Sequence, residues 1–170
     1  MSGVSFGGVP SGVDVGTWSC VARIDRVGQR RELAGAAIFD VIEISNDEGR
    51  TATLTEMSAG DTVAACLREG ALVELWALSI ESGGGRGGIL YAARPLGDGT
   101  PEAAGVMAQD LSLVELFVTA ARDRAKRQMI AGVLLLPLLV GALFIRAALR
   151  SRRLAALVPS PDALRATLPA

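Results

Sequence analysis

The chain has 170 residues and a mass of 17.6 kDa, which is enough for one small domain and an additional segment. Half of the residues are hydrophobic but only 4% are aromatic, and the mean hydropathy of +0.38 suggests a membrane segment. The absence of histidine excludes histidine-dependent triads, histidine general bases and histidine metal ligands. Two cysteines alone cannot form a four-ligand zinc site.

The formal net charge of −1 conceals two unlike parts of the chain. Residues 1–108 contain 8 arginines against 14 aspartates and glutamates, a balance of −6. Residues 109–170 contain 9 lysines and arginines against 4 acidic residues, a balance of +5. The acidic first part disfavours nucleic acid as a partner, because single-strand binding requires a basic groove and stacking aromatics.

The first part of the chain is predicted to form a small β domain over residues 13–98, after a flexible N-terminus at 1–12. The order of its elements, β-β-β-α-β-β, resembles that of the OB-fold, a five-stranded barrel. A small β-sandwich, in which residues 61–68 are only a loop, is the alternative. The expected elements are strands at 18–24, 36–44 and 50–57, a helix at 61–68, and strands at 71–80 and 89–94.

A glycine-rich run, GGGRGG, lies between the last two predicted strands. No helix and no Lys-Ser/Thr pair follows it, so the pattern predicts a mobile hairpin loop rather than a phosphate-binding loop. In OB-folds the loop at this place often lines the ligand face. The candidate contacts with a protein partner are therefore Gly83, Gly85, Arg86 and Gly88.

No catalytic residue, metal site or cofactor is predicted. Cys20 and Cys66 lie in different elements, which fits two reduced, buried thiols or, in an oxidising compartment, a disulfide. Three aspartates, Asp25, Asp40 and Asp61, are not expected to share one face, so they do not indicate a catalytic carboxylate pair.

The C-terminal part is predicted to form a linker over 99–111, an amphipathic juxtamembrane helix over 112–127 and a transmembrane helix over 128–149. Ser112 and Glu115 have the spacing of a capping box at the start of the first helix. Residues 150–170 are expected to form a short tail.

The transmembrane prediction rests on the uncharged run from Met129 to Ile145, MIAGVLLLPLLVGALFI. Extended over 128–149, a helix of this sequence would rise about 33 Å, enough to cross a hydrocarbon core of about 30 Å. A buried core helix is the alternative. Pro137 would kink the helix rather than end it, and the spacing of the glycines indicates helix pairing only weakly.

Basic residues flank this run on both sides. Arg122, Arg124, Lys126 and Arg127 precede it, as a solvated flank or as contacts for anionic lipid headgroups. Four arginines follow it, so the positive-inside rule gives no orientation. Because the first 20 residues lack the features of a signal peptide, we expect a single-pass protein of the cell membrane with its N-terminal domain in the cytoplasm.

The layout resembles membrane-anchored OB-like families. These are the beside-a-membrane domain of the mitochondrial membrane ubiquitin ligase group, with its prokaryotic relatives, and the NfeD-like proteins. In the first family a β domain ends in a polar segment like 109–116 and a basic turn like 122–127, before a spanning helix. This chain lacks a first transmembrane helix and cannot form a RING, so the resemblance implies architecture and no ligase activity.

The sequence thus predicts a membrane-anchored, non-enzymatic interaction or scaffold protein that contacts the lipid bilayer and a protein partner. An accessory subunit or regulator of a membrane protease or transport complex is one alternative. A membrane-bound enzyme that uses carboxylates is the other. No oligomeric state is predicted.

Overall fold

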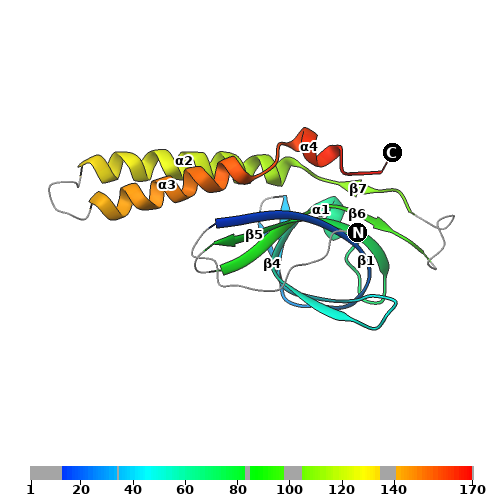
Figure 1. The fold of residues 1–170 in the computed structure, drawn as a ribbon. Helices are drawn as coiled ribbons and strands as arrows, with labels where there is room; N and C mark the ends of the chain where they lie inside the picture. The colour runs from blue at the N-terminus through cyan, green and yellow to red at the C-terminus, as the bar shows by residue number, and fades with distance from the viewer. Residues whose placement is uncertain (1–12, 34, 83–84, 98–104, 135–140, 170) are drawn as a thin grey trace.

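Most of the chain up to Pro95 forms strands that close into a five-stranded barrel (Figure 1). The structure, a computed structural model, describes residues 13–33, 35–82, 85–97, 105–134 and 141–169. The strands are β1 (Val13–Val27), β2 (Arg30–Leu33), β3 (Ala36–Ser45), β4 (Thr51–Gly60), β5 (Leu72–Ser82) and β6 (Gly85–Pro95).

The barrel closes through the neighbour order β1–β5–β6–β4–β3, with β3 also paired to β1. The pairing of β4 with β6 is parallel, and the other pairings are antiparallel. A short helix, α1 (Asp61–Ala64), connects β4 to β5 at the predicted place, but it ends four residues before the predicted limit of 68. Two further strands were not predicted: β2 extends the sheet beside β3, and β7 (Ala108–Gln109) pairs with β6 inside the stretch expected to be a linker.

The barrel interior is filled by apolar residues that alternate along each strand. On β5, Val73, Leu75 and Ala77 face inward and are fully buried. The same interior contains Phe39 and Ile42 from β3. The prediction of a mainly β protein with a closed barrel is therefore confirmed.

The outer wall of β5 and β6 is also apolar, and it is covered. Trp76 and Leu78 alternate with the inward residues of β5 and belong to a second buried cluster. On β6 a bulge at Tyr91, which faces no partner on β5, turns both Tyr91 and Ala92 outward. Apolar residues on both faces of a strand require cover on both sides.

Three C-terminal helices provide this cover. They are α2 (Ser112–Leu134), α3 (Gly141–Leu157) and α4 (Pro161–Arg165). Val114 at the start of α2, Val158 after α3 and Leu164 on α4 all pack into the cluster around Trp76 and Tyr91. Figure 1 shows α2 and α3 lying side by side along the barrel and extending beyond one end of it.

The C-terminal helices differ from the single continuous helix that the sequence predicts over 128–149. Instead, α2 ends at Leu134 and α3 returns antiparallel to it. None of the helices in the described ranges is long and apolar enough to cross a membrane. Pro137, expected to kink a continuous helix, lies in 135–140, outside the described residues.

The start of α2 also differs from the predicted capping box. Both the N–H and the hydroxyl of Ser112 donate to the Asp110 carboxylate, at 2.9 and 2.5 Å. The Glu115 N–H donates to the Leu111 carbonyl instead of the Ser112 side chain. A carboxylate at this position also offsets the partial positive charge of the helix N-terminus.

The glycine run is a strand rather than a loop over its described part. Gly85–Gly88 form the beginning of β6, while Gly83 lies outside the described residues. A Cβ on Gly88 would lie 2.4 Å from the Leu78 carbonyl oxygen and 3.0 Å from the Met57 methyl carbon. Glycine is required here because β6 fits closely between β5 and β4.

Gly88→Ala is therefore expected to lower the free energy of unfolding by about 1–3 kcal/mol, because the nearest obstacle is backbone. The matched control is Gly16→Ala, whose Cβ would meet only the Ser79 hydroxyl, at 3.3 Å. Urea unfolding followed by tryptophan fluorescence measures both variants. Equal stability of the two variants would contradict the close approach of β6.

Candidate functional site

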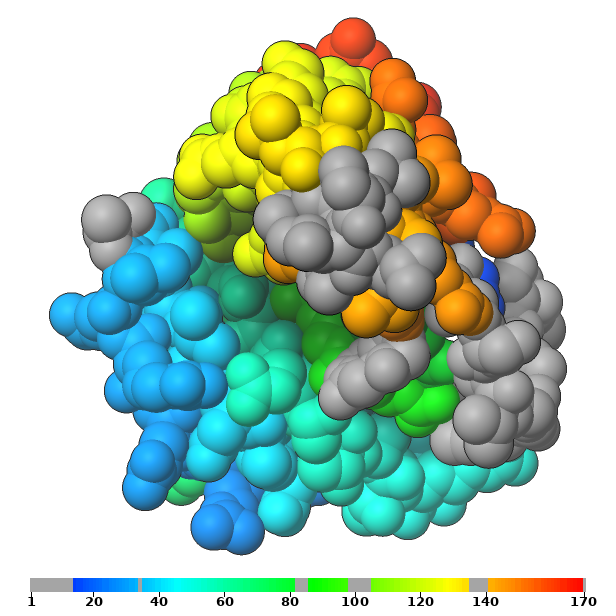
Figure 2. Space-filling view, turned by 90° about the vertical axis from the view of Figure 1, so that its left-hand side faces the viewer, coloured from blue at the N-terminus to red at the C-terminus, as the bar shows by residue number. Residues whose placement is uncertain are grey.

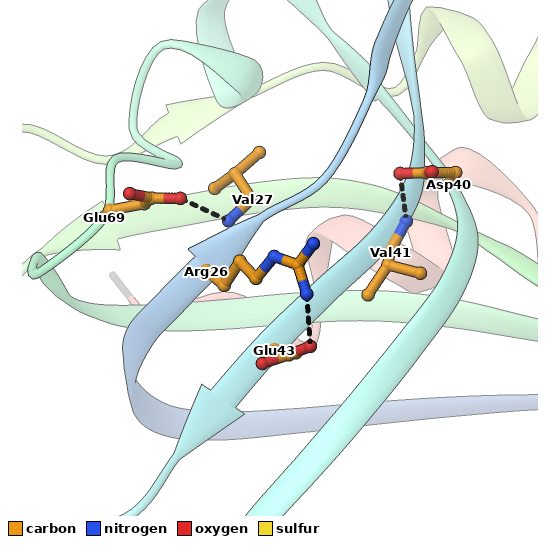
Figure 3. Close-up of polar contacts among 6 residues, drawn as sticks. All are labelled: Arg26, Val27, Asp40, Val41, Glu43 and Glu69. Atoms are coloured by element: carbon orange, nitrogen blue, oxygen red, sulfur yellow. Dashed lines mark hydrogen bonds and ion pairs between the residues drawn. The ribbon is translucent and has the colours of Figure 1, made fainter.

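The charged residues at the closure of the barrel pair with one another or with backbone N–H groups of the strands (Figure 3). Glu69 accepts the Val27 N–H at 3.0 Å, and Arg26 lies 3.3 Å from Glu43. Asp40 accepts the N–H of the residue that follows it, at 2.7 Å. Across the described ranges, no group of three or more Cys, Asp or Glu side chains is arranged to hold a metal ion.

The other two aspartates considered in the sequence lie elsewhere. Asp25 accepts the Ser45 hydroxyl at 2.8 Å on the outside of the β1–β3 junction. Asp61 is exposed at the start of α1. These carboxylates are bound to neighbouring groups of the barrel or open to solvent.

The predicted partner loop is reduced to one exposed side chain. Arg86 forms an ion pair with Glu81, which lies directly opposite it in the β5–β6 register. Gly85 and Gly88 belong to β6 and present no side chain. Arg86 and Glu81 thus form a surface ion pair near the end of the β5–β6 strand pair.

Both cysteines are free and half-buried. Cys20 lies on β1, and Cys66 follows α1. Burial raises the pKa of the Cys20 thiol to about 11. Burial also raises the pKa of Cys66, an effect that the nearby Arg68 guanidinium opposes. The sequence leaves open two free thiols or a disulfide, and the structure has two free thiols. Because their pKa values are raised above 9.0, both are protonated at neutral pH.

This environment predicts slow alkylation of Cys20 in the folded protein. Only the thiolate reacts, so a pKa near 11 rather than 9.0 makes the reaction about a hundredfold slower at pH 8. A Cys66→Ala variant treated with iodoacetamide isolates Cys20, and its rate should rise about tenfold per pH unit from pH 8 to 10. The control is the same variant unfolded in guanidinium. A folded rate equal to the unfolded rate would show that the thiol is not shielded.

The most distinctive feature of the surface is the hairpin of α2 and α3. The two helices pack against each other, and most of the residues buried on them are small: Ala121 and Ala125 on α2, and Ala148 and Ala155 on α3. Near the far end, a Cβ on Gly132 would lie 2.7 Å from the Ile145 side chain and 3.1 Å from the Gly141 carbonyl oxygen.

A polar contact joins the middle of the hairpin. The Ser151 hydroxyl donates to the Gln128 side-chain oxygen across the helix pair, at 3.2 Å. Together with the small residues, this contact places the two helices in a defined antiparallel register. In the sequence, the spacing of Gly132 and Gly141 indicates helix pairing only weakly.

The far end of the hairpin exposes large apolar side chains. Ile130, Val133 and Leu134 on α2, and Leu143 on α3, are between 57% and 73% exposed. None of the residues at 128–134 and 141–145 is charged. Figure 2 looks at this end of the molecule and shows the yellow end of α2 and the orange start of α3 together above the barrel.

Basic side chains lie behind this apolar end on both helices. All eight are exposed, and the two helices carry only two acidic residues, Glu115 and Asp123, a balance of +6. Lys126 lies 3.8 Å from Asp123. The eight are the predicted lipid contacts Arg122, Arg124, Lys126 and Arg127, and, on α3, Arg146, Arg150, Arg152 and Arg153.

The antiparallel arrangement brings together two basic groups that the sequence places at opposite ends of a span. The sequence does not distinguish the two arrangements, because an uninterrupted apolar run has the same appearance in a span and in a hairpin. Pro137 near the middle of the run was the available signal for a reversal.

Comparisons with protein-family models, curated proteins and solved structures find no match for this chain.

Proposed function

We propose that this protein is a non-enzymatic interaction protein that the α2–α3 hairpin attaches to the surface of an anionic lipid bilayer. The observation that carries the proposal is the exposed, uncharged end of the hairpin. Large apolar side chains gathered at a projecting end, rather than scattered singly, are typical of membrane or protein contact sites. The basic residues directly behind them favour a bilayer.

The dimensions of the uncharged end suit the membrane interface. On α2 the residues after Arg127 rise about 10 Å to Leu134, and on α3 about 7 Å separate Gly141 from Arg146. Amphipathic helices that lie in the plane of the membrane bury their apolar face about 5–10 Å into the boundary between headgroups and acyl chains, a depth similar to the length of this uncharged end. Arg146, the basic residue nearest to the end, can extend its side chain back toward the headgroups.

The charge distribution supports anionic lipid as the contact. Each lysine or arginine close to an anionic surface contributes about 1 kcal/mol to binding. The acidic first part of the chain is repelled by the same surface. The barrel is thus held beside the membrane rather than pressed onto it, and its surface stays available to a protein partner.

The strand order and the parallel β4–β6 pairing support the OB-like interpretation of the barrel. The arrangement of barrel followed by helices supports the resemblance to membrane-anchored OB-like families, which stays a prediction. A protein partner and the absence of catalytic activity are likewise predictions. The cytoplasm remains the proposed side for the barrel.

The attachment is tested by replacing an apolar residue at the end of the hairpin with an acidic one. Leu134→Asp is expected to lower partitioning into phosphatidylcholine vesicles that contain phosphatidylserine by about tenfold or more, because a carboxylate is costly to insert. Flotation of the purified full chain with vesicles measures the bound fraction.

The matched control is Leu33→Asp, because Leu33 is 63% exposed on β2 and the change in charge is identical. This control should bind like the unmodified protein. Vesicles of phosphatidylcholine alone should bind less protein, since they lack anionic headgroups. Equal binding by the two aspartate variants, or no flotation of the unmodified chain, would contradict attachment through the hairpin.

A further inference from the structure

The C-terminus of the described chain is part of the same buried cluster as the barrel wall. Leu164 on α4 is fully buried, and Val158 is 8% exposed. Both pack with Trp76 and Tyr91 of the barrel. The Tyr91 hydroxyl also lies 3.0 Å from the Thr167 hydroxyl. A membrane between α4 and the barrel would separate all of these contacts.

The path between the barrel and α4 is a closed hairpin. Its two helices are joined by the Gln128–Ser151 hydrogen bond and by the tight approach at Gly132. Opening the hairpin into one span would lose this packing and would also uncover the apolar outer wall of β5 and β6.

The basic residues give an independent indication. In a single span, four of them would lie at one surface of the membrane and four at the other. In the hairpin all eight lie behind one apolar end, where they can contact the headgroups of one leaflet together. Basic residues gathered on one side of the membrane agree with the positive-inside rule, by which lysine and arginine are concentrated at one membrane face.

We infer that the hairpin enters and leaves the membrane by the same face, with the barrel and α4 on one side. This inference rests on the proposed attachment to a bilayer. The apolar end reaches into one leaflet, and the C-terminal helix stays docked on the barrel while the protein is bound. This entry and exit by one face replaces the single-pass arrangement expected from the sequence.

A disulfide across the hairpin tests this directly. Gln128→Cys and Ser151→Cys are introduced together in a full chain in which Cys20→Ala and Cys66→Ala remove the natural thiols. The oxidised protein cannot open into one span, whereas the reduced form of the same variant can. Both forms should float equally with phosphatidylcholine vesicles that contain phosphatidylserine.

The flotation results test the attachment to the bilayer and the closed hairpin separately. A tenfold or greater loss of flotation on oxidation would show that attachment requires an open hairpin, and would overturn the inference while the proposed attachment stands. Failure of both forms to float, together with failure of the unmodified chain, would overturn the attachment and the inference with it.

A second measurement covers the case in which the disulfide does not form. Single cysteines at exposed positions, Ala163→Cys on α4 and Thr51→Cys on the barrel, are placed in the same cysteine-free chain. An impermeant maleimide is then applied to right-side-out and inside-out membrane vesicles from the producing cells. Modification of both positions in the same vesicle population supports the inference, and modification in opposite populations overturns it.

Discussion

The arrangement of this protein depends on one constraint, the apolar outer wall of β5 and β6. Trp76, Leu78, Ile89 and Tyr91 point away from the barrel interior and are nevertheless buried. Leaving them in water would cost about 1.5–3 kcal/mol for each large side chain. The C-terminal helices therefore lie against this wall, and the direction in which the hairpin projects follows from where Val114, Val158 and Leu164 fit into it.

The barrel could be predicted from sequence because its signals are local. Strands alternate, turns carry Asn, Asp and Gly, and a short helix follows the third predicted strand. Over its described part, 85–88, the glycine run is a strand rather than the predicted loop: glycine is typical of loops, whereas Gly88 is needed for close approach between strands. Only the three-dimensional neighbours of a glycine distinguish these two uses.

Apart from Pro137, the sequence gives no local signal for the hairpin, because the apolar wall that the helices cover is distant in sequence. Residues 71–80 are apolar on both faces, which already implied a cover for the outer wall. The cover comes from Val158 and Leu164, far along the chain. The predicted lipid contacts on α2 are exposed, as such contacts require. The basic residues of α3 become their neighbours only because α3 runs antiparallel to α2.

Hydrogen exchange of the full chain, measured with and without anionic vesicles, tests whether the hairpin and α4 stay docked on the barrel when the protein binds a membrane. The Leu164 N–H donates to the Ser160 carbonyl and the Ala166 N–H to the Asp162 carbonyl, at 3.0 Å each, so exchange at these two groups reports whether α4 and its caps stay docked. We expect vesicles to slow exchange at 130–134 and 141–145 and to leave the protection of α4 unchanged. Loss of protection in α4 on membrane binding would show that the hairpin leaves the barrel wall, and would contradict attachment through a closed, docked hairpin.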